Sequence, residues 1–243
     1  REKKGYDVLV SDKNEIDDNL KDFLNEQGIQ FEAGKHSIEN MKFADFIIKS
    51  PGISSDSDVI KKLIQEGKEI ISEIEFAARY TSAILIGITG TNGKTTTTML
   101  TYKILKDSGL NVGIAGNIGD SFAFQVAKNN FDYYVLEISS FQLDDIREFV
   151  PHISVITNIT PDHLDRYNYS FKKYIKSKLK ILRNQSETDF FLFNAGDPVL
   201  KKAIKKKNIK PQKIPLGVGK DLEGVSIKED QIIIKHKKKK IMI

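Results

Sequence analysis

One stretch, residues 84–98, constrains this chain more than any other, because it has the sequence ILIGITGTNGKTTTT. The apolar run rich in isoleucine predicts a buried strand, a glycine-rich turn follows it, and Lys94 opens a helical pattern. A strand, a glycine turn, a Lys–Thr pair and a helix in this order are typical of nucleoside triphosphate binding. Ile88 stands where the usual pattern has its first glycine, with Gly87 and Gly90 on either side. The alternative is a plain strand-to-helix turn, but the context on both sides favours nucleotide binding.

The positions of this loop have different predicted tasks. Backbone N–H groups of the glycine turn are expected to surround phosphate oxygens, helped by the positive end of the following helix. Lys94 is expected to contact the outer phosphates, and Thr95 or Thr96 to offer a hydroxyl to Mg²⁺. The predicted nucleotide-binding residues are Gly90, Thr91, Asn92, Gly93, Lys94, Thr95 and Thr96.

The composition bounds the class of protein. The 243 residues, 40% of them hydrophobic, suffice for one large or two ordinary domains with a sizeable core. Cysteine is absent, which excludes disulfides and cysteine metal sites and is compatible with the cytoplasm, where we expect the protein. The longest apolar stretches, such as Ala83–Ile88, are far shorter than the roughly 20 residues that span a bilayer, so we expect no membrane insertion.

The net charge of +5 comes largely from lysines late in the chain, at positions 201, 202, 205–207 and 237–240. Two interpretations are open, a nucleic-acid-binding patch and a solvated helix face followed by a basic strand. Aromatic and arginine residues do not interleave with these lysines, and a nucleic-acid surface would need them. We therefore favour the solvated face and expect no nucleic-acid partner.

The pattern of elements predicts an α/β fold with two units. Residues 1–82 are expected to form a Rossmann-like domain, and residues 83–243 a P-loop-type, doubly wound domain with parallel strands. In the first domain we expect strands at Gly5–Asp12, Phe43–Ser50 and near Ile70, and helices at Ile16–Gly28 and Val59–Gly67. The strand ending at Asp12 has the features of the second strand of such a domain. The first strand and its glycine turn are thus expected to precede the chain, with residues 1–4 ending a helix.

In the second domain, strands alternate with helices. Strands are predicted at Ile84–Ile88, Val112–Ala115, Tyr133–Ile138, Ser154–Asn158 and Phe190–Asn194, and helices at Thr95–Ser108, Phe122–Asn129, Phe171–Arg183 and Pro198–Lys207. Residues 225–243 are expected to add antiparallel strands. Ligands of such a sheet bind at the carboxyl ends of its strands.

Polar groups follow several of these strands. Glu137 ends one strand, and a carboxylate facing the phosphate loop is a natural Mg²⁺ ligand, although a surface glutamate is the alternative. His163 lies between two aspartates just past another strand, which favours a ligand or proton-transfer role over a structural one. The glycine turn around Asn117 is a weak candidate for a second anion site. The basic residues of helix 171–183, among them Lys173, Lys176, Lys178, Lys180 and Arg183, indicate a solvated face, and periodicity does not distinguish Lys178 from the others.

These motifs resemble a known family, the Mur ligases, which are ATP-dependent amide ligases of peptidoglycan precursor synthesis. The matching motifs are TGTNGKTTT at 89–97, GNIG at 116–119, LEISSFQL at 136–143 and NITPDHLDRY at 158–167. The first is shared with folylpolyglutamate synthase. LEISSFQL and the DRY ending are more selective and resemble the branch that adds D-glutamate to UDP-N-acetylmuramoyl-L-alanine. SDK at 11–13, SPGI at 50–53 and SEIEF at 72–76 also fit its N-terminal domain.

The resemblance implies a two-step reaction, in which ATP converts the substrate carboxylate into an acyl phosphate and the amine of D-glutamate displaces phosphate. It implies two Mg²⁺ ions and a carbamylated lysine as cofactors. The implied catalytic residues are Lys94, His163 and Lys178, and the implied metal ligands are Thr95, Glu137, His163 and the carbamate of Lys178. The implied contacts to the UDP-linked substrate are Asp12, Lys13, Ser50, Gly52, Asn117 and Ser139.

The resemblance also implies further parts of the enzyme. A domain that holds D-glutamate and an asparagine region that binds adenine are expected to follow Ile243, so we expect these 243 residues alone to be inactive, and the protein to be a monomer. The alternatives are another Mur ligase, a folylpolyglutamate synthase, or a P-loop module without ligase chemistry. LEISSFQL speaks against the synthase. A GTPase would need an Asn-Lys-x-Asp motif, which this sequence lacks.

Overall fold

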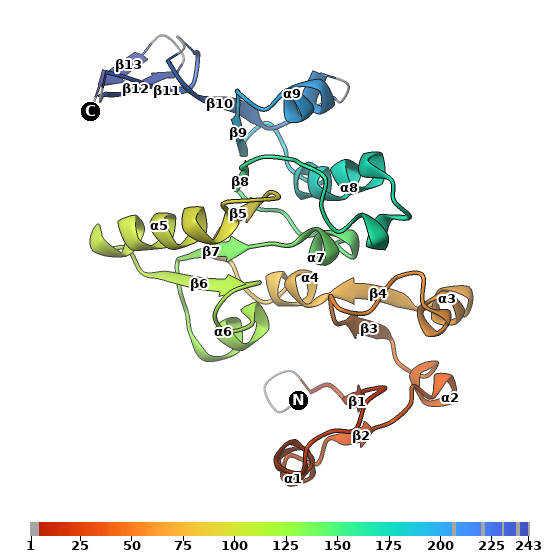
Figure 1. The fold of residues 1–243 in the computed structure, drawn as a ribbon. Coiled ribbons are helices and arrows are strands. Elements are labelled where there is room, and N and C mark those ends of the chain that lie inside the picture. Colours follow the sequence, from red (N-terminus) through yellow and green to blue (C-terminus); the bar gives the residue numbers. More distant parts are fainter. Residues whose placement is uncertain (1–4, 206–207, 220–221, 230, 237–238, 243) are drawn as a thin grey trace. The chain divides into compact units, whose positions relative to one another are not determined.

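The computed structural model describes residues 5–205, 208–219, 222–229, 231–236 and 239–242 (Figure 1). Residues 1–4, expected to end a helix, and lysines 206, 207, 237 and 238 of the predicted basic clusters lie outside these residues. The chain divides into two compact units, the first formed by residues 1–48 and 53–70, the second by residues 49–52 and 71–243. The sequence placed the boundary later, after residue 82. Ile74 and Ala77 of helix α4, Glu73–Ala78, belong to the core of the second unit, which draws this segment into it.

The first unit is built from short elements. In chain order these are β1 Leu9–Ser11, α1 Asp18–Glu26, β2 Gln30–Glu32, α2 Ile38–Met41, β3 Phe46–Lys49, α3 Asp58–Gln65 and β4 Glu69–Ser72, the last residues of β3 and β4 being counted with the second unit. Strands β1 and β2 pair in parallel, and β3 pairs with β4. Ile60 and Leu63 of α3 pack against Ile70 of β4. Strand β1 is shorter than predicted, with Gly5 in a left-handed turn conformation (φ 70°) ahead of it, and β2 and α2 were not predicted.

The second unit alternates strands and helices as the sequence predicted. After α4 come β5 Ile84–Thr89, α5 Lys94–Asp107, β6 Val112–Gly116, α6 Phe122–Lys128, β7 Tyr133–Glu137, α7 Ser140–Asp144, β8 Ile153–Ile156, η1 Leu164–Tyr167, α8 Phe171–Lys178, η2 Leu179–Leu182, β9 Phe190–Asn194, α9 Pro198–Lys205, β10 Gln212–Val218, β11 Val225–Lys228, β12 Gln231–His236 and β13 Lys239–Met242. The predicted helix 171–183 is divided, because the chain tightens into the 3₁₀ turn η2 after Lys178.

In the described part of the chain, nine strands form one sheet in the order β13-β12-β11-β10-β9-β8-β5-β7-β6. All neighbours from β6 to β11 are parallel, and β12 and β13 are antiparallel. The predicted α/β class with a parallel, doubly wound sheet is confirmed. One detail differs: β11 was expected to be antiparallel, but it runs parallel to β10, with Leu216 opposite Val225. The antiparallel addition begins at β12.

Both faces of this sheet are covered by helices. Side chains alternate between the faces of a strand, so Tyr134 and Leu136 of β7 lie on one side and Val135 on the other. Tyr134 and Leu136 pack in the larger core, which includes residues of α4, α6, α7, α8 and α9. Val135 packs in the smaller core, to which α5 contributes Tyr102 and Leu105. No helix among the described residues combines the length and apolar character needed to cross a bilayer.

The order of the strands positions a site at their carboxyl ends. Strand β5 lies between β7 and β8, and the chain turns to β6 and β7 on one side of β5 and to β8 and β9 on the other (Figure 1). Such a reversal leaves an opening at the carboxyl edge of an α/β sheet, where ligands bind. The loops that follow β5, β7 and β8 carry the residues predicted to act on the nucleotide.

Candidate active site

The turn between β5 and α5 requires glycine at Gly90. Gly90 has φ 150°, and a Cβ atom at this position would lie 1.9 Å from Oγ1 of Thr157, which is too close for any side chain. Gly93 has φ 77° and forms the N-cap of α5 without a side-chain hydrogen bond. The N–H groups of the first turn of α5, which includes Thr95 and Thr96, therefore have no capping side chain. Such a helix end attracts anions.

Asn158, two residues after β8, holds the turn between β5 and α5 through three hydrogen bonds. Its carbonyl oxygen accepts a hydrogen bond from Thr91 N at 3.0 Å, and its Oδ1 accepts one from Asn92 N at 2.9 Å. Its Nδ2 donates to the carbonyl oxygen of Asn92 at 3.0 Å. Two of the N–H groups predicted to surround phosphate are thus engaged by Asn158. The helix start at Gly93 and Lys94 is left as the part of the loop able to receive an anion.

Glu137 lies at the end of β7 and is only 2% exposed. Oγ1 of Thr95 donates to its Oε2 at 2.7 Å, and Nδ2 of Asn117 donates to its Oε1 at 2.9 Å. Both donors are neutral, and within the described residues Glu137 forms no ion pair. A buried carboxylate without charge compensation favours a cation, and carboxylate and hydroxyl oxygens are the ligands that Mg²⁺ prefers. Thr95 and Glu137 therefore fit a magnesium ion.

Lys178, at the end of α8, is 1% exposed, so the prediction of a solvated lysine face is wrong at this position. The helix turns Tyr174, Ser177 and Lys178 inward, because they fall on one side of it. The Lys178 amine donates to the carbonyl oxygen of Gly90 at 2.6 Å and lies 4.8 Å from the ring centroid of Tyr174. Burial, the largest cause, and the nearby Lys94 ammonium together lower the pKa of Lys178 to about 7, against the opposing effect of the Asp162 carboxylate.

Lys94 opens α5 and has its amine directed at its own loop. Its Nζ donates to the carbonyl oxygen of Thr91 at 2.8 Å. The hydroxyl of Thr91 in turn donates to the carbonyl oxygen of Thr160 at 3.0 Å and lies 3.2 Å from the hydroxyl of Tyr174. The loop after β5, the loop after β8 and helix α8 are therefore joined around two lysines.

His163 lies at the edge of this group. It has φ 47°, its side chain is 57% exposed, and its Nε2 lies 3.6 Å from Oδ2 of Asp162. Its ring packs at 5.4 Å from that of Phe141. In the part of the chain that the structure describes, no three His, Cys, Asp or Glu side chains form a group able to hold a metal. The structure thus brings Thr95 and Glu137 together, whereas the polar contact of His163 is with Asp162.

The residues predicted to contact the UDP-linked substrate lie in different places. Asp12 and Lys13 follow β1 and are exposed, and Oδ1 of Asp12 accepts from Asn14 N at 2.9 Å. Ser50 and Gly52 lie in the short segment 49–52 that belongs to the second unit. Asn117 binds Glu137, as described above. Ser139 is the N-cap of α7 in a capping box with Gln142, so its hydroxyl has a structural partner.

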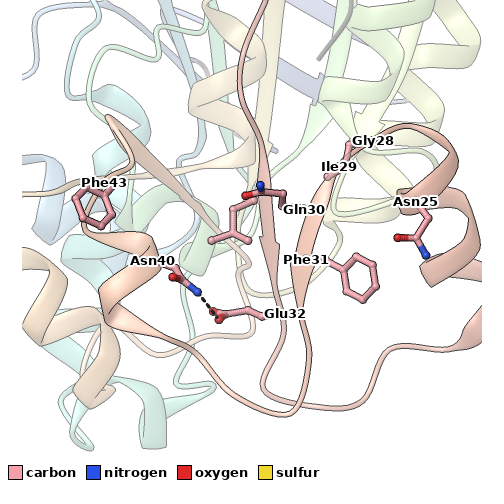
Figure 2. A pocket seen from close by; sticks show the side chains of 9 residues that line it. Asn25, Gly28, Ile29, Gln30, Phe31, Glu32, Asn40 and Phe43 are labelled. Atoms are coloured by element: carbon pink, nitrogen blue, oxygen red, sulfur yellow. Dashed lines mark hydrogen bonds between the residues drawn. The ribbon is translucent and has the colours of Figure 1, made fainter.

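A hollow of about 680 Å³ lies within the first unit, around β2 and the end of α1 (Figure 2). Figure 2 shows Glu32 and Asn40 in it, joined by a hydrogen bond of 3.4 Å. Burial alone would raise the pKa of Glu32, but hydrogen bonds from Ser11, Ser37 and Asn40 together lower it to about 2. None of the residues predicted to contact the substrate lines this hollow.

Two side chains of the site were not found from the sequence. Asn158 had been noted only as the end of a strand, and Tyr174 not at all. A signal for Tyr174 exists in hindsight, because it lies one helical turn before Lys178 and shares its face. The role of Asn158 depends on the approach of two loops that are distant in sequence, for which local patterns carry no signal.

A phosphate-binding turn, a buried carboxylate on the neighbouring strand and a doubly wound sheet define a P-loop-type nucleotide-binding protein. Residues 88–243 match the family model described as Mur ligase middle domain, and residues 1–59 match the one described as MurD N-terminal domain. The chain belongs to the Mur ligase family, which confirms the family expected from the motifs.

Two similar relatives carry the name UDP-N-acetylmuramoylalanine–D-glutamate ligase. The protein of Bacteroides fragilis is 48% identical over 231 residues, which cover 95% of this chain and 52% of the relative. That of Christiangramia forsetii is 46% identical over 233 residues, which cover 96% of this chain and 52% of the relative. The chain spans about half the length of these relatives.

Solved structures support the fold alone. The UDP-N-acetylmuramate:L-alanyl-gamma-D-glutamyl-meso-diaminopimelate ligase from Neisseria meningitides has a TM-score of 0.61 and 18% identity, covering 98% of this chain and 79% of that one. The MurF ligase from Thermotoga maritima, in complex with ADP, has a TM-score of 0.54 and 16% identity, covering 100% of this chain and 56% of that one.

Proposed function

We propose that this chain carries the ATP-binding part, and a part of the substrate-binding domain, of a ligase that joins D-glutamate to UDP-N-acetylmuramoyl-L-alanine. The first unit would belong to the domain that holds the UDP-linked substrate. We place this activity in the cytoplasm, where ATP is available. The single observation that carries the proposal is the contact between Thr95 and the buried Glu137, because it joins the phosphate loop to a carboxylate suited to Mg²⁺. The names of the relatives support the choice of substrates.

The chemistry requires two anions, a carboxylate and a triphosphate, to approach each other. Lys94 and the first turn of α5 would hold the phosphates and offset their charge. Thr95 and Glu137 would hold one Mg²⁺, and His163 would lie near a second, as the family resemblance implies. Bound Mg²⁺ supplies further charge neutralisation at the transferred phosphoryl group. Asn117, whose amide binds Glu137, would orient this carboxylate and contact the substrate.

Lys178 is proposed to act as a carbamate. A neutral amine attacks the carbon of CO₂, the new N–C bond forms, and one proton leaves to solvent, so that a cation becomes an anionic oxygen ligand. Burial supports this role, since it lowers the pKa of Lys178 to about 7 and leaves a large neutral fraction near neutrality. Its place beside Gly90 O supports it too, because this puts the lysine next to the phosphate loop. Once Lys178 is carbamylated, the nearby Asp162 carboxylate would face the carbamate anion in place of the lysine ammonium.

Phosphate release tests the function. The protein in its natural length is given ATP, Mg²⁺ and UDP-N-acetylmuramoyl-L-alanine, and D-glutamate, L-lysine, meso-diaminopimelate and L-alanine are supplied in turn. Release only with D-glutamate is expected. Release with another amino acid would keep the ligase chemistry and change the specificity, whereas no release with any of the four would favour a nucleotide-binding module without ligase activity.

A further inference from the structure

Arg166, in the turn η1, connects two segments that are distant in sequence. Its Nη1 donates to the carbonyl oxygen of Gly52 at 3.2 Å, and its Nη2 donates to the carbonyl oxygen of Pro51 at 3.2 Å. Both contacts lie within the second unit, which includes residues 49–52. A guanidinium presents its donors in a rigid planar fork, so two successive carbonyl oxygens fix both the position and the tilt of the bound segment.

The guanidinium is itself held by an aromatic ring. Its central carbon lies 4.5 Å from the ring centroid of Phe141 in α7. The same ring lies 5.4 Å from that of His163. Phe141 therefore contacts both Arg166 and His163, and the three side chains form one packed group.

The turn that carries Arg166 is anchored on both sides. His163 precedes it with φ 47° and Asn168 follows it with φ 51°, so a left-handed residue brackets each end. Tyr167, the last residue of the turn, is buried, and its hydroxyl donates to Oδ2 of Asp144 at 3.0 Å. These contacts hold the turn that carries Arg166 in one conformation.

The segment held by Arg166 has a second anchor. Lys49 is 3% exposed, and its Nζ lies 2.9 Å from Oδ2 of Asp145, directly after α7. The segment 49–52 is thus grouped with the second unit, while residues 48 and 53 on either side belong to the first. Two cationic contacts, one from within the segment and one from η1, hold it against the loops that follow β7 and β8.

We propose that Arg166 is a positioning residue that couples the segment at Pro51 and Gly52 to the nucleotide site. This inference rests on the proposed function, in which His163 would lie near a metal ion, and on the substrate contacts of Ser50 and Gly52 that the family resemblance implies. Substrate bound at this segment restrains Arg166, Phe141 and, through them, His163. Binding of the UDP-linked substrate and of ATP then becomes linked, and linkage is reciprocal.

Titration calorimetry on the protein in its natural length tests this coupling. The Kd of UDP-N-acetylmuramoyl-L-alanine is measured with and without a saturating, non-hydrolysable ATP analogue and Mg²⁺. In the unchanged protein we expect the analogue to alter this Kd by about fivefold or more. In Arg166→Met, which keeps apolar contact with Phe141 but has no donors, the ratio falls to about one. The Kd of the analogue alone is expected to stay within about twofold, since Arg166 makes no contact with the phosphate loop.

Two further variants refine the test. Arg166→Lys is expected to give an intermediate ratio, because an ammonium reaches one carbonyl oxygen where the fork reaches two. Lys172→Met, an exposed cation on α8, is the matched control and is expected to keep the ratio of the unchanged protein. Retained coupling in Arg166→Met would overturn this inference alone, as would a ratio of one in the unchanged protein. An equal loss of both affinities with a lower melting temperature would mean a purely structural role and also overturn it. Failure of the unchanged protein to bind either ligand would overturn the proposed function itself.

Discussion

The amine of Lys178 donates a hydrogen bond of 2.6 Å to the carbonyl oxygen of Gly90, so helix α8 and the phosphate loop meet at a buried lysine. The side chain is 1% exposed, and no carboxylate of the described residues forms an ion pair with it. An ammonium in such a place is costly, because desolvation exceeds what one neutral acceptor returns. Because burial favours the neutral amine, Lys178 is suited to react with CO₂. Its titration should also be measurable as a change in the stability of the chain with pH.

The stability of the chain is expected to depend on pH through Lys178. Its pKa is about 7 in the folded chain against an ordinary value of 10.5, so between these values the unfolded chain binds more protons. The free energy of unfolding then rises with pH, by up to about 1.4 kcal/mol per pH unit, and the full penalty is present below pH 7. Lys178→Met removes this dependence. Denaturant unfolding between pH 6.5 and 9 in CO₂-free buffer measures both slopes.

Lys176→Met is the control for this experiment, because Lys176 lies on the same helix and is exposed. It is expected to keep the slope of the unchanged chain. Loss of the hydrogen bond to Gly90 shifts the absolute stability of Lys178→Met but adds no dependence on pH. Parallel curves for the unchanged chain and Lys178→Met would show that the buried amine does not titrate near neutrality.

Gly90→Ala is expected to disrupt the phosphate loop. The new Cβ would lie 1.9 Å from Oγ1 of Thr157, which itself donates to Asn92 O at 2.7 Å. Either the loop or Thr157 must move, at a cost of about 1–3 kcal/mol, and ADP affinity should fall at least about tenfold. Gly109→Ala is the control, since Gly109 has φ 82° with no atom within 4 Å of a Cβ. It should lose stability only, so equal ADP affinities in both variants would contradict this role of Gly90.

Glu137→Gln tests the proposed magnesium site. The substitution keeps the shape of the side chain and removes the charge that compensates a cation, so ADP should no longer bind more tightly with Mg²⁺ than with a chelator. Stability without metal should stay similar or rise, because a buried charge is lost. Calorimetric titration with ADP in both conditions provides the comparison, and exposed Glu148→Gln serves as control. A magnesium effect that survives Glu137→Gln would place the ion elsewhere.

Local patterns predicted much of the fold but not the interior of the site. The strand–turn–helix at residues 84–98 and the strand ending at Glu137 follow from hydrophobic runs and glycine, which act over a few residues. The alternation of strands and helices predicts that these strands are parallel. The order that makes β5 and β7 neighbours, with Ile88 opposite Glu137, was not predicted and is seen in the structure. Burial of Lys178 does not follow, because the six basic residues at 171–183 resemble a solvated face and only packing decides which one turns inward.

The errors in the predicted fold also come from packing that local sequence patterns do not show. The helical pattern of residues 171–183 continues through η2, so the sequence predicted one helix. The change to a 3₁₀ turn after Lys178 depends on packing, since Leu179, Ile181 and Leu182 are all buried. All strands within residues 225–243 were expected to be antiparallel, but β11 pairs with β12 on one edge and, in parallel, with β10 on the other. Short elements such as α7 have too few residues to show a period at all.

Glu75, buried in α4, is expected to stabilise the fold without acting on the nucleotide site. Its carboxylate is 0% exposed and accepts hydrogen bonds from the backbone N–H groups of Arg147 at 2.9 Å, Glu148 at 3.0 Å and Phe149 at 2.8 Å, directly after α7. These three bonds reach Oε2, whereas Oε1 accepts from Nε of Arg79 at 3.2 Å. Glu75→Gln places a neutral amide donor against Arg79 in place of this oxygen and removes the charge of the ion pair, at a cost of about 2–4 kcal/mol and a melting temperature lower by about 5–10 °C. Calorimetry of the chain measures this, with exposed Glu187→Gln as control. Because the affected loop leads away from the phosphate turn, ADP affinity below the transition should change less than about twofold, and a larger loss would mean that Glu75 acts on the nucleotide site directly.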